Sequence, residues 1–526
     1  MPLFSAQFHN KIYIIALVLL VVSLPFSIFT LSVAQIILMA NWILEGKFHQ
    51  KLEVVKRRPS LWAIALFYIV HLLWMANTSD TAWGMHDLRI KLPMLVIPLV
   101  IGTSVTINEN KLKTILNFYI IAVLAASLIS VFSIFGFDHK LMHSVSDYSR
   151  YVSHITWSIM VAIAIFIISW QFGKTPVRYR WLFVPICIWF VIYLFILQVL
   201  TGIVIFILTI PILLFWTIFQ YHNLMFRWFM VVIILTIVLV TTNYLIHSYA
   251  TFHTFDKIDA STLENYTTIG NRYYHDTKSK IVENGHFVNI YICEPELEKS
   301  WNRRSKLSYS GTTLNGEELK RTLTRYLTSK GLRKDSAGMN QLTDNEIKFI
   351  EWGKTNYIDT LKYNLNSRIY VTWWELYNYT NGVSPSGYSV AQRIESLKTA
   401  FQIIHKNFWL GVGTGDIPDA FAEQYVINNS SLPIKNRIRT HNQYVTFIVT
   451  FGIIGFIFVM FSLITPPFFE KKFSNYLFFV IFIIGMLSFV NEDTLETHQG
   501  ISRFAVFYFL FLFSAPPFKK DHHVEI

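Results

Sequence analysis

The chain has 526 residues, of which 53% are hydrophobic and only 15% charged, and its mean hydropathy is +0.40. A soluble protein would carry about 25% charged residues, so the composition excludes an ordinary soluble enzyme and predicts an integral membrane protein. A net charge of +12 would suggest nucleic-acid binding in a soluble protein, but these cations gather in short loops between apolar runs, and no nucleic-acid partner is expected.

Apolar runs recur along the chain, and we interpret each as able to cross a hydrocarbon core of about 30 Å. The sequence therefore predicts an all-α polytopic protein with about 12 transmembrane helices. The expected spans cover residues 12–26, 28–44, 61–77, 92–106, 112–134, 152–170, 181–198, 202–219, 228–247, 443–465, 475–490 and 501–515. Lys11 precedes an apolar stretch that is too long for a cleavable signal peptide, so none is expected.

The positive charges predict the orientation of these spans. If both termini are cytoplasmic, sixteen lysines and arginines between Lys11 and Lys520 lie inside. Outside the long polar segment, the opposite side has only Arg89, Lys91, Lys140, Arg150 and Arg503. This asymmetry is the one that the positive-inside rule expects of a multi-pass membrane protein, and it places the long polar segment outside, which in a bacterial inner membrane is the periplasm.

That segment divides the chain into three predicted parts. They are an N-terminal bundle of about nine spans (1–247), a periplasmic helical domain carrying part of the active site (248–440), and a C-terminal bundle of about three spans (441–526). Within the periplasmic domain, apolar residues three or four apart predict helices over residues 317–326, 342–352 and 391–408. We expect these helices to cover the outer mouth of the membrane bundle.

One stretch of about 65 residues carries the most specific signal. A helix headed by Arg393 runs into the turn Gly411-Val-Gly-Thr-Gly415, and about 25 residues later His441-Asn442 opens an apolar span. This pattern resembles the O-antigen ligase / O-antigen polymerase superfamily of bacterial envelope glycosyltransferases. The closing segment, residues 491–500, also looks like the loop before the last span of such ligases.

The resemblance implies a reaction. A glycan on undecaprenyl diphosphate is transferred to an acceptor hydroxyl, which is the lipid A-core in ligases, with inversion and without metal or other cofactor. His441 is similar to the essential histidine of the family and Arg393 to its helix-head arginine. A near-neutral base that removes the acceptor proton and an arginine that holds the diphosphate are the groups this chemistry needs.

Other polar residues near these motifs are candidates for binding diphosphate or sugar. Arg437, Arg439 and Asn442 flank His441, and Asp416 follows the glycine turn. Each also has a plain structural alternative, since the arginines could anchor lipid headgroups, Asp416 could cap the next helix and His441 could be an ordinary interfacial histidine.

One position departs from the family pattern. Many ligases carry an arginine in a mid-chain span, but residues 197–202 contain none. Arg150 and Arg272 are the cations we consider as replacements.

The shared motif describes the donor reaction and leaves the acceptor open. A repeat-unit polymerase or a protein O-oligosaccharyltransferase would carry the same residues. A polysaccharide transporter is the competing class, but it should show internal pseudo-symmetry, broken helices and ionisable residues near mid-bilayer, and we expect none of these from the sequence. The expected partners are the lipid-linked donor, the glycan acceptor and membrane lipids.

Overall fold

The computed structural model describes residues 5–135, 152–220, 223–256, 259–360, 365–382, 385 and 388–514. The chain is 72% helical, which confirms the all-α prediction. It divides into two compact units, of which unit 1 comprises Met1–His222 with Gln392–Ile526 and unit 2 comprises Asn223–Ala391.

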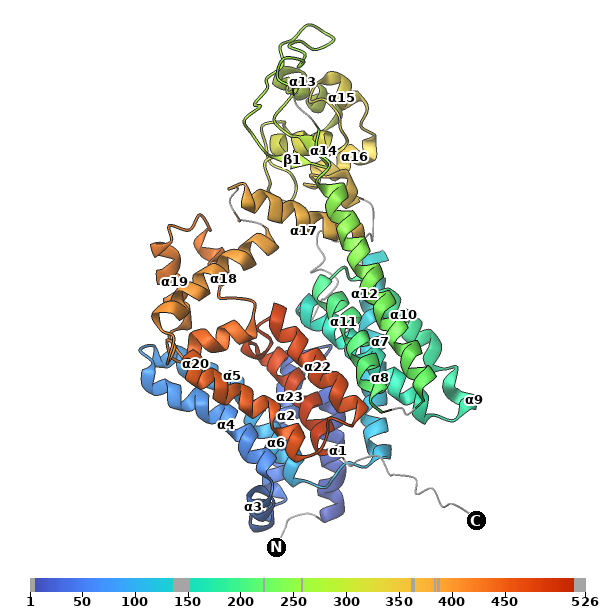
Figure 1. Cartoon of the computed structure of the whole chain (residues 1–526), viewed down its shortest axis with the longest axis vertical. Coiled ribbons are helices and arrows are strands. Elements are labelled where there is room, and N and C mark those ends of the chain that lie inside the picture. The colour runs from blue at the N-terminus through green and yellow to red at the C-terminus, as the bar shows by residue number, and fades with distance from the viewer. Residues whose placement is uncertain are drawn as a thin grey trace. The chain divides into compact units, whose positions relative to one another are not determined.

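Unit 1 is built from helices of both ends of the chain (Figure 1). Its N-terminal helices are α1 (Ala6–Ser23), α2 (Ile28–Leu44), α3 (Phe48–Arg57), α4 (Pro59–Leu73), η1 (Trp74–Asn77), α5 (Thr81–Lys91), α6 (Pro93–Thr103), α7 (Glu109–Phe135), α8 (His154–Lys174), α9 (Val177–Arg180), α10 (Phe183–Ile196) and α11 (Leu200–Ile218). Its C-terminal helices are α19 (Ile417–Ile427), η4 (Ile434–Asn436), α20 (Gln443–Ile464), α21 (Pro466–Phe469), α22 (Tyr476–Asn491), η5 (Thr494–Glu496) and α23 (His498–Phe513). Helix α18 (Ser389–Lys406) begins in unit 2 and continues in unit 1.

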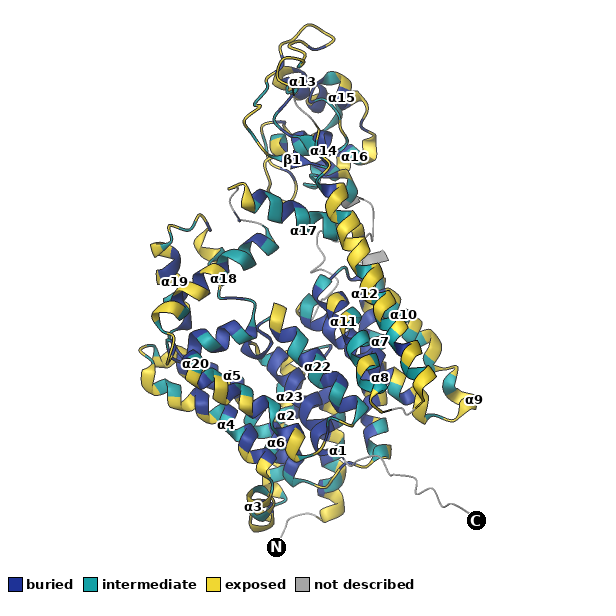
Figure 2. Ribbon diagram, viewed as in Figure 1, coloured by how far each residue is buried: buried dark blue, intermediate teal, exposed yellow. Residues whose placement is uncertain are grey.

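Every predicted span coincides with a helix, but the count of twelve is not confirmed. Among the described residues, eight helices are long and apolar enough to cross a membrane, or nine if α2 and α3, bent by 107°, form one broken span. Helix α6 has 11 residues, and α22 and α23 have 16 each. Helix α23 is buried from Gln499 to Phe513 (Figure 2), so its apolar residues face other helices and need not meet lipid.

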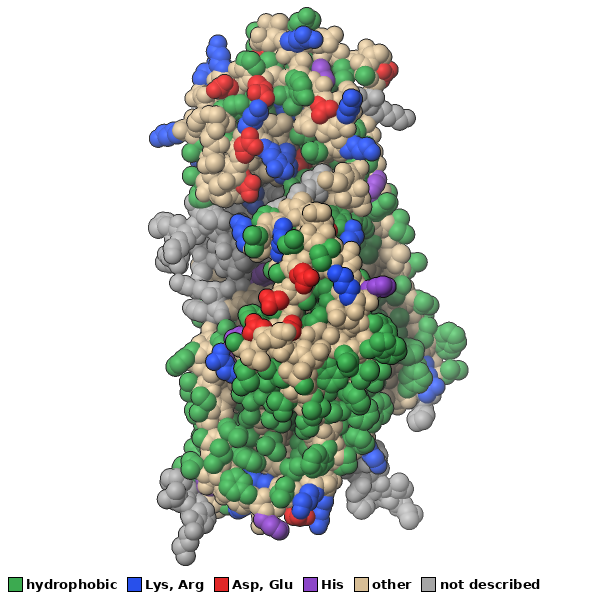
Figure 3. All heavy atoms as spheres, turned by 90° about the vertical axis from the view of Figure 1, so that its left-hand side faces the viewer, with side chains coloured by type: hydrophobic (Ala, Val, Ile, Leu, Met, Phe, Trp, Pro, Cys, Tyr) green, Lys and Arg blue, Asp and Glu red, His purple; other side chains and the backbone are tan. Residues whose placement is uncertain are grey.

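The surface of unit 1 supports a membrane location. Figure 3 shows a broad band of hydrophobic side chains on one face, with acidic side chains along one edge of the band and lysines and arginines beyond the other. Water does not stabilise such a band, whereas a bilayer does. The chain is therefore a multi-pass membrane protein.

Two glycines, Gly411 and Gly452, allow the segment after α18 to pack closely against α20. Gly452 has φ +60° and interrupts the helical geometry of α20. Gly411, with φ +66°, packs into this kink, where an added Cβ would lie 2.4 Å from the Thr450 carbonyl oxygen. Val412 N–H then donates to Val449 O at 2.9 Å. The glycine turn thus serves close backbone approach, and it joins the helix carrying Arg393 to the span that follows His441.

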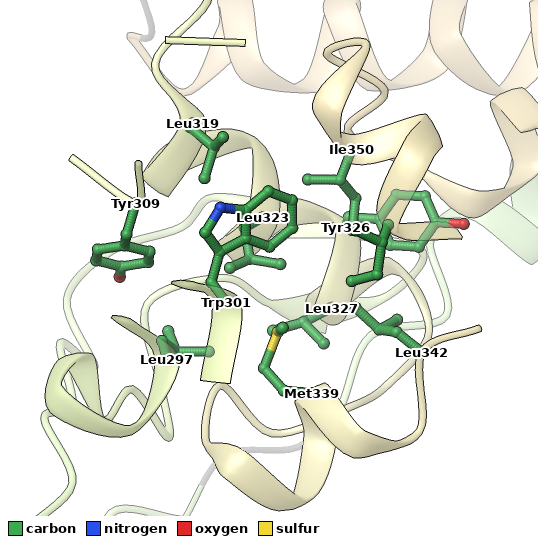
Figure 4. Packing of buried hydrophobic residues seen from close by; sticks show 11 residues of the cluster. Leu297, Trp301, Tyr309, Leu319, Leu323, Tyr326, Leu327, Met339, Leu342 and Ile350 are labelled. Atoms are coloured by element: carbon green, nitrogen blue, oxygen red, sulfur yellow. The ribbon is translucent and has the colours of Figure 1, made fainter. Parts of the chain in front are cut away.

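Unit 2 has its own hydrophobic core, formed around Trp301, Tyr326 and Leu327, all with 0% exposure (Figure 4). Its elements are α12 (Leu224–Phe252), β1 (Val282–Glu283), β2 (His286–Phe287), α13 (Glu294–Arg304), α14 (Leu319–Ser329), α15 (Ser336–Asn340), α16 (Asp344–Glu351), η3 (Tyr357–Thr360) and α17 (Leu365–Thr380). The two strands pair antiparallel, with Glu283 opposite His286. The predicted helices over residues 317–326, 342–352 and 391–408 are confirmed as α14, α16 and α18.

Candidate active site

The loop between α22 and α23 carries three carboxylates, those of Glu492, Asp493 and Glu496. Asn442 brings the start of α20 to this loop. Its side-chain oxygen caps the first turn of α20, and its side-chain amide donates to the Val490 carbonyl at 2.8 Å. Asn442 therefore caps the N-terminus of α20 and holds the preceding residue, His441, beside the acidic loop.

His441 directs one ring nitrogen toward two of these carboxylates. Its Nδ1 lies 3.5 Å from Glu492 Oε1 and 3.8 Å from Asp493 Oδ1. Both distances are too long for a hydrogen bond, and Nδ1 has no hydrogen-bond partner among the residues that the structure describes. The side chain is 28% exposed. Because Nδ1 faces the acids, Nε2 is the nitrogen left for an incoming hydroxyl group.

Arg393 meets the same carboxylate from its other side. Its Nη1 donates to both the backbone and the side-chain oxygen of Asn491 at 2.7 Å. Its Nη2 lies 3.5 Å from Glu492 Oε2. The two residues that the sequence motif singles out, Arg393 and His441, thus lie on opposite oxygens of Glu492.

Arg439 holds the second acid of the loop. Its Nε donates to Asp493 Oδ2 at 2.6 Å, and its Nη1 lies 3.4 Å from Glu496 Oε2. Burial works against the charged guanidinium, but Glu496 and Asp493 outweigh burial and raise the pKa of Arg439. Burial raises the pKa of Asp493, although Arg439 opposes the increase. Arg439 is therefore a permanently charged residue inside the cluster.

The buried residue Lys91 stabilises the acidic loop through an ion pair with Glu496. Lys91 is 0% exposed, and its Nζ lies 2.8 Å from Glu496 Oε2 and 3.2 Å from Asp87 Oδ1. Gln443 donates to Glu496 Oε1 at 2.7 Å and accepts from the Leu495 N–H at 2.7 Å. Burial alone would raise the pKa of Glu496, but Lys91 and Arg439 lower it to about 2. The Glu496 carboxylate therefore stays ionised and binds the loop to Lys91, Arg439 and Gln443.

The cluster could also be considered as a metal site. Within the described residues, ligand atoms of His441, Glu492 and Asp493 lie within 4.8 Å of one another. However, Arg393 and Arg439 already contact the two carboxylates. A divalent ion bound there would be repelled by both guanidinium groups. The arrangement favours acid–base chemistry by a histidine supported by carboxylates, with cations supplied by arginine.

The structure gives two other predicted residues structural contacts. Arg437 donates to the carbonyl oxygens of Ser430 and Leu432, at 3.1 and 2.9 Å, and so closes the loop after α19. The Asp416 carboxylate accepts backbone N–H groups from residues 79–80 at 2.8 to 2.9 Å. Both residues thus make structural contacts, although the Asp416 side chain makes no capping hydrogen bond to α19, unlike the structural alternative expected for it.

Two further cations, Arg272 and Arg150, are the predicted replacements for the missing arginine. Arg272 is an exposed side chain of unit 2, and Arg150 lies outside the described residues. The segment 197–202, where many ligases carry an arginine, lies next to the cluster, because the Asn491 side-chain amide donates to Thr201 Oγ1 at 2.8 Å. The departure from the family pattern is therefore located beside the site.

Sequence reasoning did not single out Glu492, Asp493 or Glu496 as site residues. The available signal was three acids within five residues of a short loop between two apolar runs. From the sequence, Lys91 is a cation that could reach an anionic headgroup or serve as an ordinary interfacial anchor, whereas its full burial beside Glu496 makes it part of the cluster's support.

Comparison with known families gives one match, to the O-antigen ligase family over residues 355–460. No curated protein matches the chain. The matched segment contains Arg393, the glycine turn, His441 and Asn442, which are the residues of the motif. The match thus confirms the predicted resemblance and places this segment in the O-antigen ligase superfamily.

Proposed function

We propose that this protein is a glycosyltransferase that moves a glycan from undecaprenyl diphosphate to a lipid A-core hydroxyl at the periplasmic membrane face. The observation that carries the proposal is the shared contact of Arg393 and His441 with Glu492. A base and a diphosphate-binding cation are the two groups that the transfer requires, and both lie 3.5 Å from the same carboxylate.

His441 acts as the general base. Glu492 and Asp493 face Nδ1, favour the tautomer that carries its proton there, and stabilise the imidazolium ion that forms when Nε2 takes the acceptor proton. The acceptor oxygen attacks the anomeric carbon as the bond to the diphosphate breaks, so the configuration inverts.

Arg393 and Arg439 stabilise the charge that develops on the departing diphosphate. The 3.5 Å contact between Arg393 and Glu492 is loose enough for the guanidinium to turn toward a phosphate. Arg439 is held more tightly by Asp493 at 2.6 Å and contributes mainly through its charge. Two guanidinium groups take the electrostatic role that a divalent ion has in other glycosyltransferases, and the proposed reaction uses no metal.

Repeat-unit polymerisation or transfer to a protein hydroxyl would use the same donor chemistry, and the acceptor distinguishes these activities. Deletion of the gene with analysis of surface glycans separates them. Polymer accumulating on the lipid carrier indicates a ligase, and single repeat units on the core indicate a polymerase. A deletion that leaves lipid-linked glycan on the cytoplasmic side would indicate a transporter.

Replacement of His441 by alanine tests the base directly. The variant should insert normally yet reproduce the glycan profile of the deletion, because loss of a general base costs about 10²- to 10⁴-fold in rate. His405→Ala is the matched control, since His405 is exposed near the end of α18. A wild-type profile from His441→Ala would remove the proposed base.

A further inference from the structure

Glu375 is a buried carboxylate of α17 that meets the N-terminus of α18. The side chain is 6% exposed, and its carboxylate accepts the Val390 N–H at 2.6 Å. The N–H groups of Ser389 and Ala391 also favour the charged carboxylate. The first N–H groups of an α-helix have no partner within the helix, and a carboxylate placed there satisfies them and interacts favourably with the helix dipole. Glu375 therefore caps α18 from the preceding helix.

The carboxylate and the start of α18 stabilise each other. Burial raises the pKa of Glu375, while the N–H groups of α18 and the charge of Arg368 oppose the increase. A buried carboxylate destabilises a protein unless hydrogen bonds and opposite charge replace the water that it has lost. The exposed N–H groups of the first turn of α18 supply those hydrogen bonds, so the position of this turn is tied to Glu375.

Helix α17 is itself fixed within unit 2. Trp374, the residue before Glu375, donates from Nε1 to a backbone carbonyl of β1 at 2.7 Å. The guanidinium of Arg325, in α14, lies 4.5 Å from the centre of the Trp374 ring. Tyr370, one turn earlier in α17, accepts the Asn284 N–H at 2.5 Å. The cap therefore cannot shift without breaking buried contacts of α17 with other elements of unit 2.

Arg393 lies on the capped helix, one turn beyond the cap. Val390 and Arg393 are three residues apart, which is a rise of about 4.5 Å along α18. The Arg393 guanidinium reaches the Asn491 carbonyl at 2.7 Å and Glu492 at 3.5 Å, so its position depends on the direction of the first turn. Helix ends fray more easily than helix interiors. Loss of the cap would therefore loosen the backbone that carries Arg393.

We propose that Glu375 is a positioning residue for Arg393, which holds the first turn of α18 so that the guanidinium stays at the acidic loop. The inference rests on the proposed function, in which Arg393 stabilises the departing diphosphate. It gives the hydrogen-bonded contacts of α17 within unit 2 a role in placing this cation.

The first test is amide hydrogen exchange of the full-length purified protein in detergent, measured by mass spectrometry of its peptides. Glu375→Ala should speed exchange at the start of α18 about 2- to 30-fold, because a helix cap changes local stability by about that factor. Exchange in the acidic loop, residues 491–496, should also become faster, as it should in Arg393→Ala. Glu346→Ala is the matched control, because it removes the capping carboxylate of α16, another helix of unit 2, and should leave both segments unchanged.

The second test is the rate of glycan transfer from a lipid-linked donor, expressed per folded molecule. Glu375→Ala should lower kcat about 3- to 30-fold with little change in the KM for the acceptor, because a displaced cation stabilises the transition state less. Added to Arg393→Ala, the same change should alter the rate little, since the group through which it acts is gone. A general loss of folding would instead lower the rate equally in both backgrounds. If Glu375→Ala does not fold, Glu375→Gln keeps an oxygen acceptor and should show the same pattern with smaller effects.

Unchanged exchange at the start of α18 or in the acidic loop after Glu375→Ala would overturn the inference. Equal losses of rate with and without Arg393 would also overturn it. The exchange readout does not depend on transfer. If the wild type transfers no glycan, the proposed function fails, while exchange still decides whether Glu375 positions Arg393.

Discussion

Replacing Glu492 by glutamine removes the charge that faces both His441 and Arg393 while it keeps the side chain's shape. Two unit charges about 4 Å apart near a protein surface interact by about 4 kcal/mol, before desolvation offsets part of it. Glu492 is 19% exposed and 3.5 Å from each partner. We therefore expect a net loss of about 1.4 to 2.7 kcal/mol in transition-state stabilisation, which is about 10- to 100-fold in rate.

The loss should stay smaller than that of His441→Ala, because Asp493 Oδ1 remains 3.8 Å from Nδ1. The assay is the initial rate of glycan transfer by purified protein from a lipid-linked donor to isolated acceptor. Glu423→Gln, on the exposed face of α19, is the matched control and should transfer at the wild-type rate.

The decisive measurement is a double-mutant cycle. If Glu492 acts through the imidazole, adding Glu492→Gln to His441→Ala should lower the rate much less than it does in the wild type. The remaining effect would come from Arg393. Fully additive losses would refute the idea that this carboxylate supports the base.

Three further predictions concern stability, each measured as the thermal unfolding midpoint of the full-length protein in detergent. Glu496→Gln leaves buried Lys91 with one carboxylate fewer and should lower the free energy of unfolding by about 3 to 5 kcal/mol. Adding Lys91→Met should recover part of this loss. No recovery would contradict the pairing of the two side chains. Gly411→Ala should lower the free energy of unfolding by more than about 1 kcal/mol, because φ is +66° and the added Cβ meets backbone. The control, Gly173→Ala, has open space around it and should leave the stability unchanged. Equal effects of the two changes would count against the packing of the glycine turn. Burial lowers the pKa of Lys334 in unit 2 from about 10.5 to about 7, so the fold is destabilised below pH 7 and this penalty fades as pH rises toward 10.5. Lys334→Met should accordingly stabilise the protein at pH 7 and lose that advantage by pH 10.5, and a gain independent of pH would speak against a buried charged amine.

The positions of the helices follow directly from the sequence, because helix-forming apolar runs and their caps are local features. Thr343 and Glu346, for example, are three residues apart in sequence and form a capping box at the start of α16. The number of spans does not follow in the same way. A run such as 501–515 has the same composition whether lipid or protein surrounds it, and burial of α23 within unit 1 is a property of packing.

The site shows the same division between local and distant information. His441 and Arg393 stand out because the motif around each is contiguous in sequence. The acidic loop that they both contact does not stand out in the sequence, because the contacts that form the site join distant residues. Arg393 and Asn491 are 98 residues apart, and Lys91 and Glu496 are 405 apart. Only the folded arrangement of α5, α18, α20 and α22 makes Glu492 the shared partner.

The charge balance of the cluster explains why a further cation would help the proposed reaction. Carboxylates outnumber the lysine and arginine side chains paired with them by four to three: Asp87, Glu492, Asp493 and Glu496 against Lys91, Arg393 and Arg439. A diphosphate arriving at a site with excess negative charge is repelled unless another positive charge faces it. When His441 takes the acceptor proton, the imidazolium ion adds a positive charge as the diphosphate departs. The cluster is therefore least favourable to the anion before the donor binds and most favourable at the transition state, which is the difference that catalysis requires.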